Sequence, residues 1–178
     1  SEKRLVERFC SEYEVFTPDM TELKSGKWYL VTGTNVLDHG LLIGSSAYII
    51  LEDGCRLELH GEKSGQPGID VERGLVDDRL HIYGQKDGTG QLLAWGGEEC
   101  AGIGGRAGSL YGSSCGEIYI HGGHIEAYGG SHGAAGIGGG ARETPIYPLA
   151  PFLDTRHSNF FLGGDGPKKL NIYGGEIF

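Results

Sequence analysis

Short alternating segments that end in glycine recur along this chain. Each has an apolar residue, a variable residue, a second apolar residue, a histidine or tyrosine, and then a glycine. Four segments have this form: Leu57–Gly61, Leu80–Gly84, Ile118–Gly122 and Leu170–Gly174. Side chains alternate between the two faces of a β-strand, so the apolar positions point to one side and the others to the opposite side. The pattern therefore predicts short strands with one buried face, each ended by a glycine corner.

A longer repeat sets the spacing of these strands. The phrase Ala-Gly-Ile-Gly-Gly occurs around Ile103 and again around Ile137, 34 residues later, and the same interval backwards reaches Ile69. A fixed period of this size is typical of stacked structural units. Between the two phrases lie two β-rich segments, Glu117–Gly123 and His124–Gly130. One unit is therefore predicted to hold three short strands, which is the content of one coil of a parallel β-solenoid.

Other stretches fit the same plan. Trp28–Thr32 and Tyr48–Leu51 are rich in aromatic and β-branched residues, which favour strands. Second strands follow three of the glycine-ended segments, at Leu92–Trp95, Ile125–Tyr128 and Ile177–Phe178.

The first thirteen residues have a different period. Apolar residues fall there at helical spacing, opposite charged ones, and they are Leu5, Val6, Phe9, Cys10 and Tyr13. This predicts an amphipathic helix over Ser1–Tyr13. We expect residues 1–20, the helix and a turn, to cap the open edge of the first coil. Binding of a partner by this helix is the alternative.

Residues 21–178 are expected to form the Gly-rich β-helix, interrupted by a proline-rich loop over 144–159. Proline cannot donate a hydrogen bond to a sheet, and Pro145, Pro148 and Pro151 are crowded there. At Phe178 the last unit is incomplete, which predicts an edge with unpaired backbone groups. We expect this edge to pack against another chain, as a homo-oligomer, or against a further C-terminal segment. The alternative is that the proline-rich loop covers it.

Composition narrows the classes of function. The 34 glycines among 178 residues lack the three-residue period of collagen and alternate with Ile, Leu and Tyr, which favours corners in a β fold over disorder. The 15 Lys and Arg against 24 Asp and Glu give a net charge of −9, which disfavours a nucleic-acid partner. No apolar run is long enough for a transmembrane helix. Cys100 and Cys115 flank one glycine-rich corner, where a disulfide and two buried thiols are the alternatives.

Several of these stretches together resemble one group of proteins. The residues that carry the resemblance are Lys27–Val31, Ile50–Cys55, Leu80–Gln85 and the two Ala-Gly-Ile-Gly-Gly phrases. They are similar to Gly-rich, "GIGGG"-type repeat proteins of the bacterial surface, over roughly Leu23 to Phe178. The resemblance implies a pectate-lyase-like architecture, an extracellular or cell-surface location and, by analogy, contact with glycans. We therefore expect an all-β fold, a right-handed parallel β-helix with an N-terminal α-helical cap.

Outward side chains of the predicted strands are candidates for glycan contact. If the four glycine-ended segments stack in register, they form two columns of outward residues. One column holds His60, Tyr83, His121 and Tyr173, and the other holds Glu58, His81, Tyr119 and Asn171. Trp95 and Tyr128 form a shorter aromatic row. Flat rings suit the apolar faces of sugars, whereas the alternative is a stacking ladder that only stabilises the strands.

Charged residues add further candidates. Arg106 and Arg142 each follow a glycine phrase, where they could grip an acidic sugar or pair with nearby carboxylates. A glycoside hydrolase needs two carboxylates that face one groove, and Glu58 and Glu126 are the strand-borne acids. No catalytic residue is assigned from the sequence.

No cofactor is expected, apart from the option of Ca²⁺ held by acidic residues in turns. These acids are Glu52–Asp53, Asp77–Asp78, Asp87 and Glu98–Glu99, and solvated corners are the alternative. Histidines 60, 81, 121 and 124 could supply transition-metal ligands, but they follow no fixed motif, so no metal site is predicted.

The sequence supports three hypotheses of function. The first is a non-catalytic extracellular or cell-surface module that binds polysaccharide through an exposed aromatic and histidine strand face. The second is a polysaccharide lyase or glycoside hydrolase with a groove on the β-helix. The third is a structural spacer or assembly module. The first is favoured because no strand combines clustered carboxylates with Arg or Lys, as a lyase would need.

Overall fold

The described part of the chain has an all-β fold, and every pairing between its strands is parallel. The computed structural model describes residues 10–71, 78–108, 112–141, 169–172 and 176–177. The strands make three sheets, here called sheets A, B and C. Within the described residues there is no α-helix, and one short 3-10 turn spans Gly61–Lys63. The prediction of an all-β fold is confirmed.

Sheet A has six strands and the other two have five each. In sheet A the neighbours, in order, are β1 (Glu14–Val15), β3 (Lys27–Val31), β6 (Ser46–Leu51), β9 (Arg79–Gly84), β12 (Glu117–Ile120) and β15 (Lys169–Ile172). In sheet B they are β2 (Glu22–Leu23), β5 (Leu41–Ile43), β8 (Ile69–Asp70), β11 (Ile103–Gly104) and β14 (Ile137–Gly138). In sheet C they are β4 (Thr34–Leu37), β7 (Arg56–His60), β10 (Gln91–Trp95), β13 (His124–Tyr128) and β16 (Glu176–Ile177).

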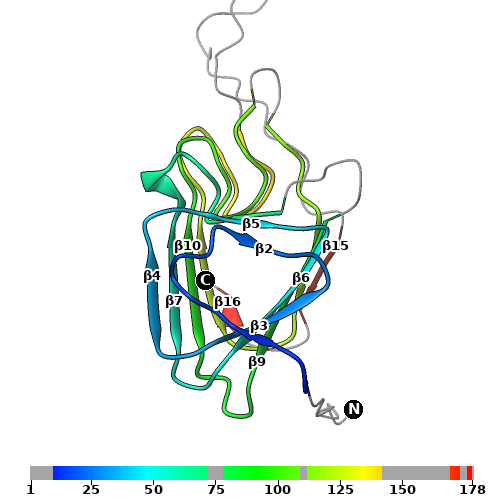
Figure 1. Ribbon diagram of the computed structural model, residues 1–178. Coiled ribbons are helices and arrows are strands. Elements are labelled where there is room, and N and C mark those ends of the chain that lie inside the picture. The colour runs from blue at the N-terminus through cyan, green and yellow to red at the C-terminus, as the bar shows by residue number, and fades with distance from the viewer. Residues whose placement is uncertain (1–9, 72–77, 109–111, 142–168, 173–175, 178) are drawn as a thin grey trace, which may run out of the picture.

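The chain visits the three sheets in a fixed rotation. From β3 onward it passes from sheet A to sheet C, then to sheet B, and returns to sheet A one strand further along. Figure 1 shows the three sheets around a common interior, with β4, β7 and β10 on the left and β2 and β5 across the top. One circuit therefore contributes three short strands, as the repeat predicts.

The 34-residue period matches the register of sheet B. Ile103 lies opposite Ile69 on one side and opposite Ile137 on the other. Leu41 continues the same ladder opposite Ile69. Isoleucines that lie 34 residues apart therefore occupy the same place in successive circuits. This explains why the phrase Ala-Gly-Ile-Gly-Gly recurs in the sequence.

The core fills the space between the sheets. Every second strand residue points inward, and most of these side chains are the Leu, Ile and Val positions of the alternating pattern. Fully buried examples from the three sheets are Ile49, Ile82, Leu57, Leu92 and Ile103. Phe16, which follows β1, also belongs to this core.

The N-terminal cap differs from the expectation where it is described. Most of the predicted helix, over residues 1–9, lies outside the described residues, and its last four residues, Cys10–Tyr13, are not helical. Within the 1–20 segment, Glu14–Val15 instead form β1, which pairs with β3. A strand therefore covers this edge of sheet A, because pairing satisfies the backbone groups of β3 directly.

Other expectations fall on parts of the chain outside the description. The proline-rich loop over 144–159 and residue Phe178 both lie there, so the predicted open edge at the chain end is not placed. All four cysteines are free thiols, so the alternative of a Cys100–Cys115 disulfide is wrong. Burial raises the pKa of the Cys115 thiol to about 12, which keeps it protonated.

Glycine in the repeated phrase is needed for close backbone packing. A Cβ atom at Gly102 would lie 2.7 Å from the backbone nitrogen of Tyr128 and 2.8 Å from the carbonyl oxygen of Gly136. Both obstacles are backbone atoms of the next circuit, which cannot move without disturbing the ladder. Gly54 is different, because a Cβ there meets nothing within 4 Å and only its φ of +79° disfavours a side chain.

We predict that Ile103→Ala destabilises the protein by about 2–5 kcal/mol, because it removes a fully buried side chain from the sheet B ladder. The matched control is Val36→Ala on β4, where the side chain is exposed and the expected change is within about 0.5 kcal/mol. Urea unfolding followed by far-UV circular dichroism measures both. Equal losses of unfolding free energy in the two variants would contradict the assignment of Ile103 to the core and of Val36 to the surface.

A second prediction compares two glycines. Gly102→Ala is expected to cost about 2–3 kcal/mol, because the new methyl group overlaps backbone of the next circuit. Gly54→Ala is expected to cost only about 1 kcal/mol, the strain of a left-handed residue without a clash. The same unfolding assay ranks them, and a larger loss at Gly54 would show that the circuits are not packed this closely.

Candidate functional site

The four glycine-ended segments do not stack in one sheet. β9, β12 and β15 are neighbours in sheet A, but Leu57–His60 belong to β7 of sheet C. In its own circuit β7 follows β6, so the segment opposite Leu80–Gly84 is Ala47–Leu51. The predicted columns that placed Glu58 and His60 beside residues of sheet A are therefore wrong.

Four other members of those columns, His81, Tyr83, Tyr119 and Asn171, lie in sheet A, and His121 directly follows β12. Tyr119 is opposite His81 on one side and opposite the Cα of Asn171 on the other. The rings of Tyr83 and His121 stack with centroids 4.1 Å apart. Tyr173 lies outside the described residues.

Two aromatic residues that were not predicted as site residues extend the sheet A stack. Trp28 lies opposite Tyr48, which lies opposite His81. Their ring centroids are 4.5 Å and 4.8 Å apart, and His81 to Tyr119 is 4.4 Å. Neither of their strands ends in His-Gly or Tyr-Gly, so the search for glycine-ended segments did not identify Trp28 and Tyr48. Their outward position in an alternating strand was the available signal.

Sheet C carries a separate row of rings. The ring of His60 stacks on Trp95 with centroids 4.6 Å apart and planes 2° apart, and Trp95 stacks on Tyr128 at 5.4 Å and 10°. The predicted row of Trp95 and Tyr128 is therefore present, and His60 is its third member.

Stacking covers the faces of these rings. A ring between two neighbours presents only its edge to solvent, so a full ring face is available only at the end of a row. Among the described residues, Tyr128 is the last ring of the sheet C row after His60 and Trp95. Its side chain is correspondingly exposed, at 43%.

Polar side chains lie beside the sheet C row in the same register. Strands β7, β10 and β13 each contribute three outward residues, and we call these nine the sheet C grid. They are Arg56, Glu58, His60, Gln91, Leu93, Trp95, His124, Glu126 and Tyr128. The grid thus has a ring row, a middle column of Glu58, Leu93 and Glu126, and a far column of Arg56, Gln91 and His124.

Hydrogen bonds fix the polar members of the grid. Arg56 pairs with Glu58 and donates to Gln91 at 2.7 Å. Glu126 accepts a hydrogen bond from the Tyr128 hydroxyl at 2.5 Å and lies 2.8 Å from His124 Nε2. These planar groups are therefore held in place before any ligand arrives.

The same contacts keep both grid carboxylates ionised. The hydrogen bond from Arg56 is the main cause that lowers the pKa of Glu58. The Tyr128 hydroxyl, followed by His124, lowers the pKa of Glu126, and that same bond raises the pKa of Tyr128. Near neutral pH both carboxylates are hydrogen-bond acceptors and neither is a proton donor.

His81, in the sheet A stack, is neutral near pH 7. Burial, followed by the nearby His121, lowers its pKa to about 4. The two imidazoles approach at 3.4 Å between His81 Nδ1 and His121 Nε2. His60 and His124 lie on sheet C instead, so the four histidines do not converge as a set of metal ligands.

One acidic turn considered for Ca²⁺ has a structural role. Asp53 accepts backbone hydrogen bonds from Asp87 at 2.9 Å and from Thr89 at 3.2 Å, in the corner of the next circuit. These bonds are the main cause that lowers the pKa of Asp53. Within the described ranges, no group of three or more His, Cys, Asp or Glu side chains has an arrangement that suits a metal ion.

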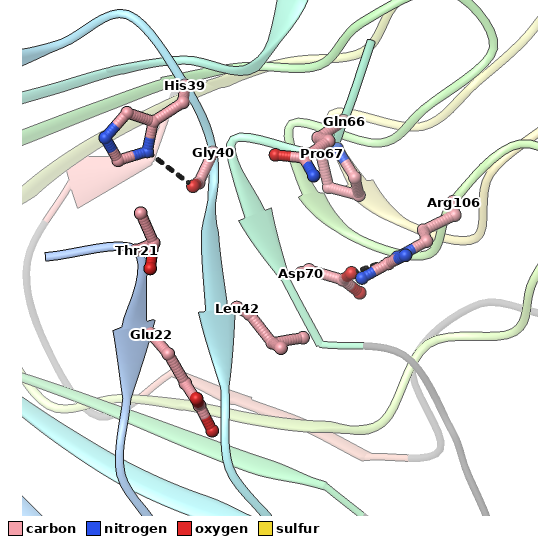
Figure 2. Close-up of a pocket in the computed structure, with 9 residues that line it drawn as sticks. All are labelled: Thr21, Glu22, His39, Gly40, Leu42, Gln66, Pro67, Asp70 and Arg106. Carbon is pink, nitrogen blue, oxygen red and sulfur yellow. Dashed lines mark hydrogen bonds and ion pairs between the residues drawn. The ribbon is translucent and has the colours of Figure 1, made fainter. Parts of the chain in front are cut away.

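Arg106 lies on the third face of the molecule. It forms an ion pair with Asp70, a buried carboxylate on β8, so pairing with a carboxylate is its observed role. The pair lines a hollow of about 280 Å³ on the outer side of sheet B (Figure 2). Arg142 lies outside the described residues.

Comparisons with protein-family models, with curated proteins and with solved structures found no match to this chain. The described residues include no helix with the length and hydropathy needed to span a membrane.

We predict that His81 makes the protein less stable as the pH falls from 6.5 towards 4. Its folded pKa lies below the unfolded value, so the unfolded chain binds more protons in this window. The stability that the neutral form of His81 gives the folded chain is therefore fully present above pH 6.5 and is lost on acidification. His81→Phe should flatten the slope of unfolding free energy against pH between 5 and 6.5. Tyr48→Phe, in the same stack, should leave that slope unchanged, and an unchanged slope in His81→Phe would contradict the assignment.

Proposed function

We propose that this chain is a right-handed parallel β-helix that binds polysaccharide, without turnover, through the sheet C grid. The fixed rotation through three parallel sheets supports the helical path. Right-handedness follows from a general rule, since about 98% of crossovers between parallel strands of one sheet have that hand.

The observation that carries the binding proposal is the composition of the grid. A sugar offers an apolar C–H face and a rim of hydroxyls, so its sites combine a ring with planar polar groups. The grid provides the exposed ring of Tyr128, and beside it Glu126 and His124 in fixed positions. Sheet A has more rings, but its neighbouring outward column contains the apolar Leu30 and Ile50. We therefore assign the contact to sheet C.

The polar groups of the grid favour a neutral polysaccharide. Two ionised carboxylates, Glu58 and Glu126, lie on the face, and the whole chain carries a net charge of −9. A polyuronate would meet like charges at this surface, which costs binding energy. Hydroxyl groups, in contrast, can donate to both carboxylates.

A hydrolase is the second candidate, because Glu58 and Glu126 share one face after all. They lie two strands apart with Leu93 between them, which places their Cα atoms about 9.5 Å apart. That is close to the spacing of an inverting glycosidase, about 6.5–9.5 Å between carboxyl groups. However, such an enzyme needs one carboxyl with a raised pKa as its acid, and both of these pKa values are lowered. Binding without hydrolysis is therefore the better proposal.

The location of the protein rests on the resemblance alone. Gly-rich repeat proteins of the bacterial surface support a secreted or cell-surface module. A structural spacer, in which the ring rows only stabilise the coils, is the third hypothesis, and the binding experiment separates it from the other two.

We predict that native gels that contain a neutral polysaccharide, such as a soluble β-glucan or soluble poly-N-acetylglucosamine, retard the migration of the chain. Gels that contain polygalacturonate should not retard it. Tyr128→Ala should weaken binding about tenfold, or roughly 1.4 kcal/mol, because the exposed ring is lost. Tyr128→Phe should retain most of the affinity, and the exposed Tyr13→Ala should retain all of it.

Assays for reducing ends and for unsaturated products decide between binding and catalysis on the same polysaccharides. Retention without products is the expected result. Product formation that is lost in both Glu58→Gln and Glu126→Gln would establish the hydrolase instead. No retention on any of the polysaccharides would leave the spacer and overturn the proposal.

A further inference from the structure

We propose that the hollow on the outer side of sheet B binds a single neutral sugar unit, at a site separate from the sheet C grid. Nine residues line it: Thr21, Glu22, His39, Gly40, Leu42, Gln66, Pro67, Asp70 and Arg106. Figure 2 shows these side chains around the outward face of β2, β5 and β8. This inference does not depend on glycan binding at sheet C.

The register of sheet B creates the hollow. Glu22, Leu42 and Asp70 occupy successive outward positions on β2, β5 and β8. The next position is Gly104 on β11, which has no side chain. The outward side chains of the floor thus end at Asp70, and Arg106, two residues after Gly104, pairs with Asp70 at that end of the hollow.

An apolar floor lies at the centre of the hollow. Leu42 is 40% exposed although it is a large aliphatic residue in the middle of a sheet. In Figure 2 it lies between Glu22 and Asp70, and Pro67 belongs to the neighbouring wall. This surface suits the C–H face of a sugar ring, which leaves water at little cost.

The walls offer both donors and acceptors. Glu22 presents a carboxylate, Thr21 a hydroxyl and Gln66 an amide. Asp70 is only 3% exposed and pairs with Arg106, so the two charges already neutralise each other. A hydroxyl both donates and accepts, so a polyol matches the mixture. A free anion would instead meet two carboxylates.

The size of the hollow limits the ligand to one ring. Its volume of about 280 Å³ corresponds to about nine water molecules at roughly 30 Å³ each. Sites for small ligands in general begin at about 300 Å³, so the hollow suits a monosaccharide or a chain-terminal residue and not an internal oligosaccharide.

The test is a titration of the isotope-labelled full chain with D-glucose, D-galactose, D-mannose and D-glucuronate, followed by the methyl signals of Leu42. We expect saturable shifts with at least one neutral hexose, at a Kd of about 1–10 mM. Glu22→Gln and Gln66→Ala should each weaken that binding at least about fivefold. Both residues are exposed, so their replacement leaves the core intact. Glu62→Gln, an exposed acid on the 3-10 turn, is the matched control and should change nothing.

Four results would overturn this site. They are an absence of Leu42 shifts with every neutral hexose, tighter binding of glucuronate than of the hexoses, shifts that persist unchanged in both variants, and shifts that Glu62→Gln abolishes equally. Tyr128→Ala in the same titration keeps the two proposals apart, because it removes the sheet C contact and should leave the Leu42 shifts intact.

Discussion

The parallel ladder between successive circuits is the constraint on which the rest of this structure depends. Each strand can satisfy its backbone N–H and C=O groups only against the strand one circuit before and one circuit after. Positions that share a place in the circuit are therefore forced into columns. Inward columns become apolar ladders, such as the one through Ile69, Ile103 and Ile137. Where circuits approach closely, as at Gly102, only glycine fits.

The same constraint shapes the outer faces. Rings at one place in the circuit must stack, as His60, Trp95 and Tyr128 do, so most of their faces are covered by one another. Stacking stabilises neighbouring circuits and leaves only ring edges and the end of a row for the sugar contact that we propose. Polar residues in the next columns pair with their neighbours, which fixes Glu58 and Glu126 as ionised acceptors. The outer face is thus preorganised for hydrogen bonding and poorly suited to proton transfer.

Parts of the fold could be predicted from the sequence because they repeat. The 34-residue period gave the correct register of sheet B, and alternation gave the inward residues. Alternation does not show to which sheet a segment belongs. Leu57–His60 and Leu80–Tyr83 have the same pattern but lie in sheet C and sheet A, respectively. The position of each segment within its circuit decides this, and unequal corner lengths conceal that position.

The candidate sites were predictable to different degrees. Trp95 and Tyr128 were found because their segments share one pattern, an apolar residue, a variable residue, alanine and an aromatic residue before glycine, whereas Trp28 and Tyr48 lacked the glycine ending. That Glu58 and Glu126 share a face follows only once Leu57, Leu92 and Ile125 are aligned. The hollow on sheet B is lined by residues of three neighbouring strands and by an ion pair between residues of different circuits, and local sequence patterns do not show that these residues meet.

The two tryptophans offer the most direct test of the central claim, because each reports on one face. Trp28 lies in the sheet A stack, and Trp95 lies beside Tyr128 in the sheet C grid. Their indole N–H signals can be followed by NMR while a soluble neutral polysaccharide is added to the folded chain. The account predicts a saturable shift of the Trp95 signal and a constant Trp28 signal. A shift of Trp28 alone, or no shift of either signal at saturating polysaccharide, would contradict it.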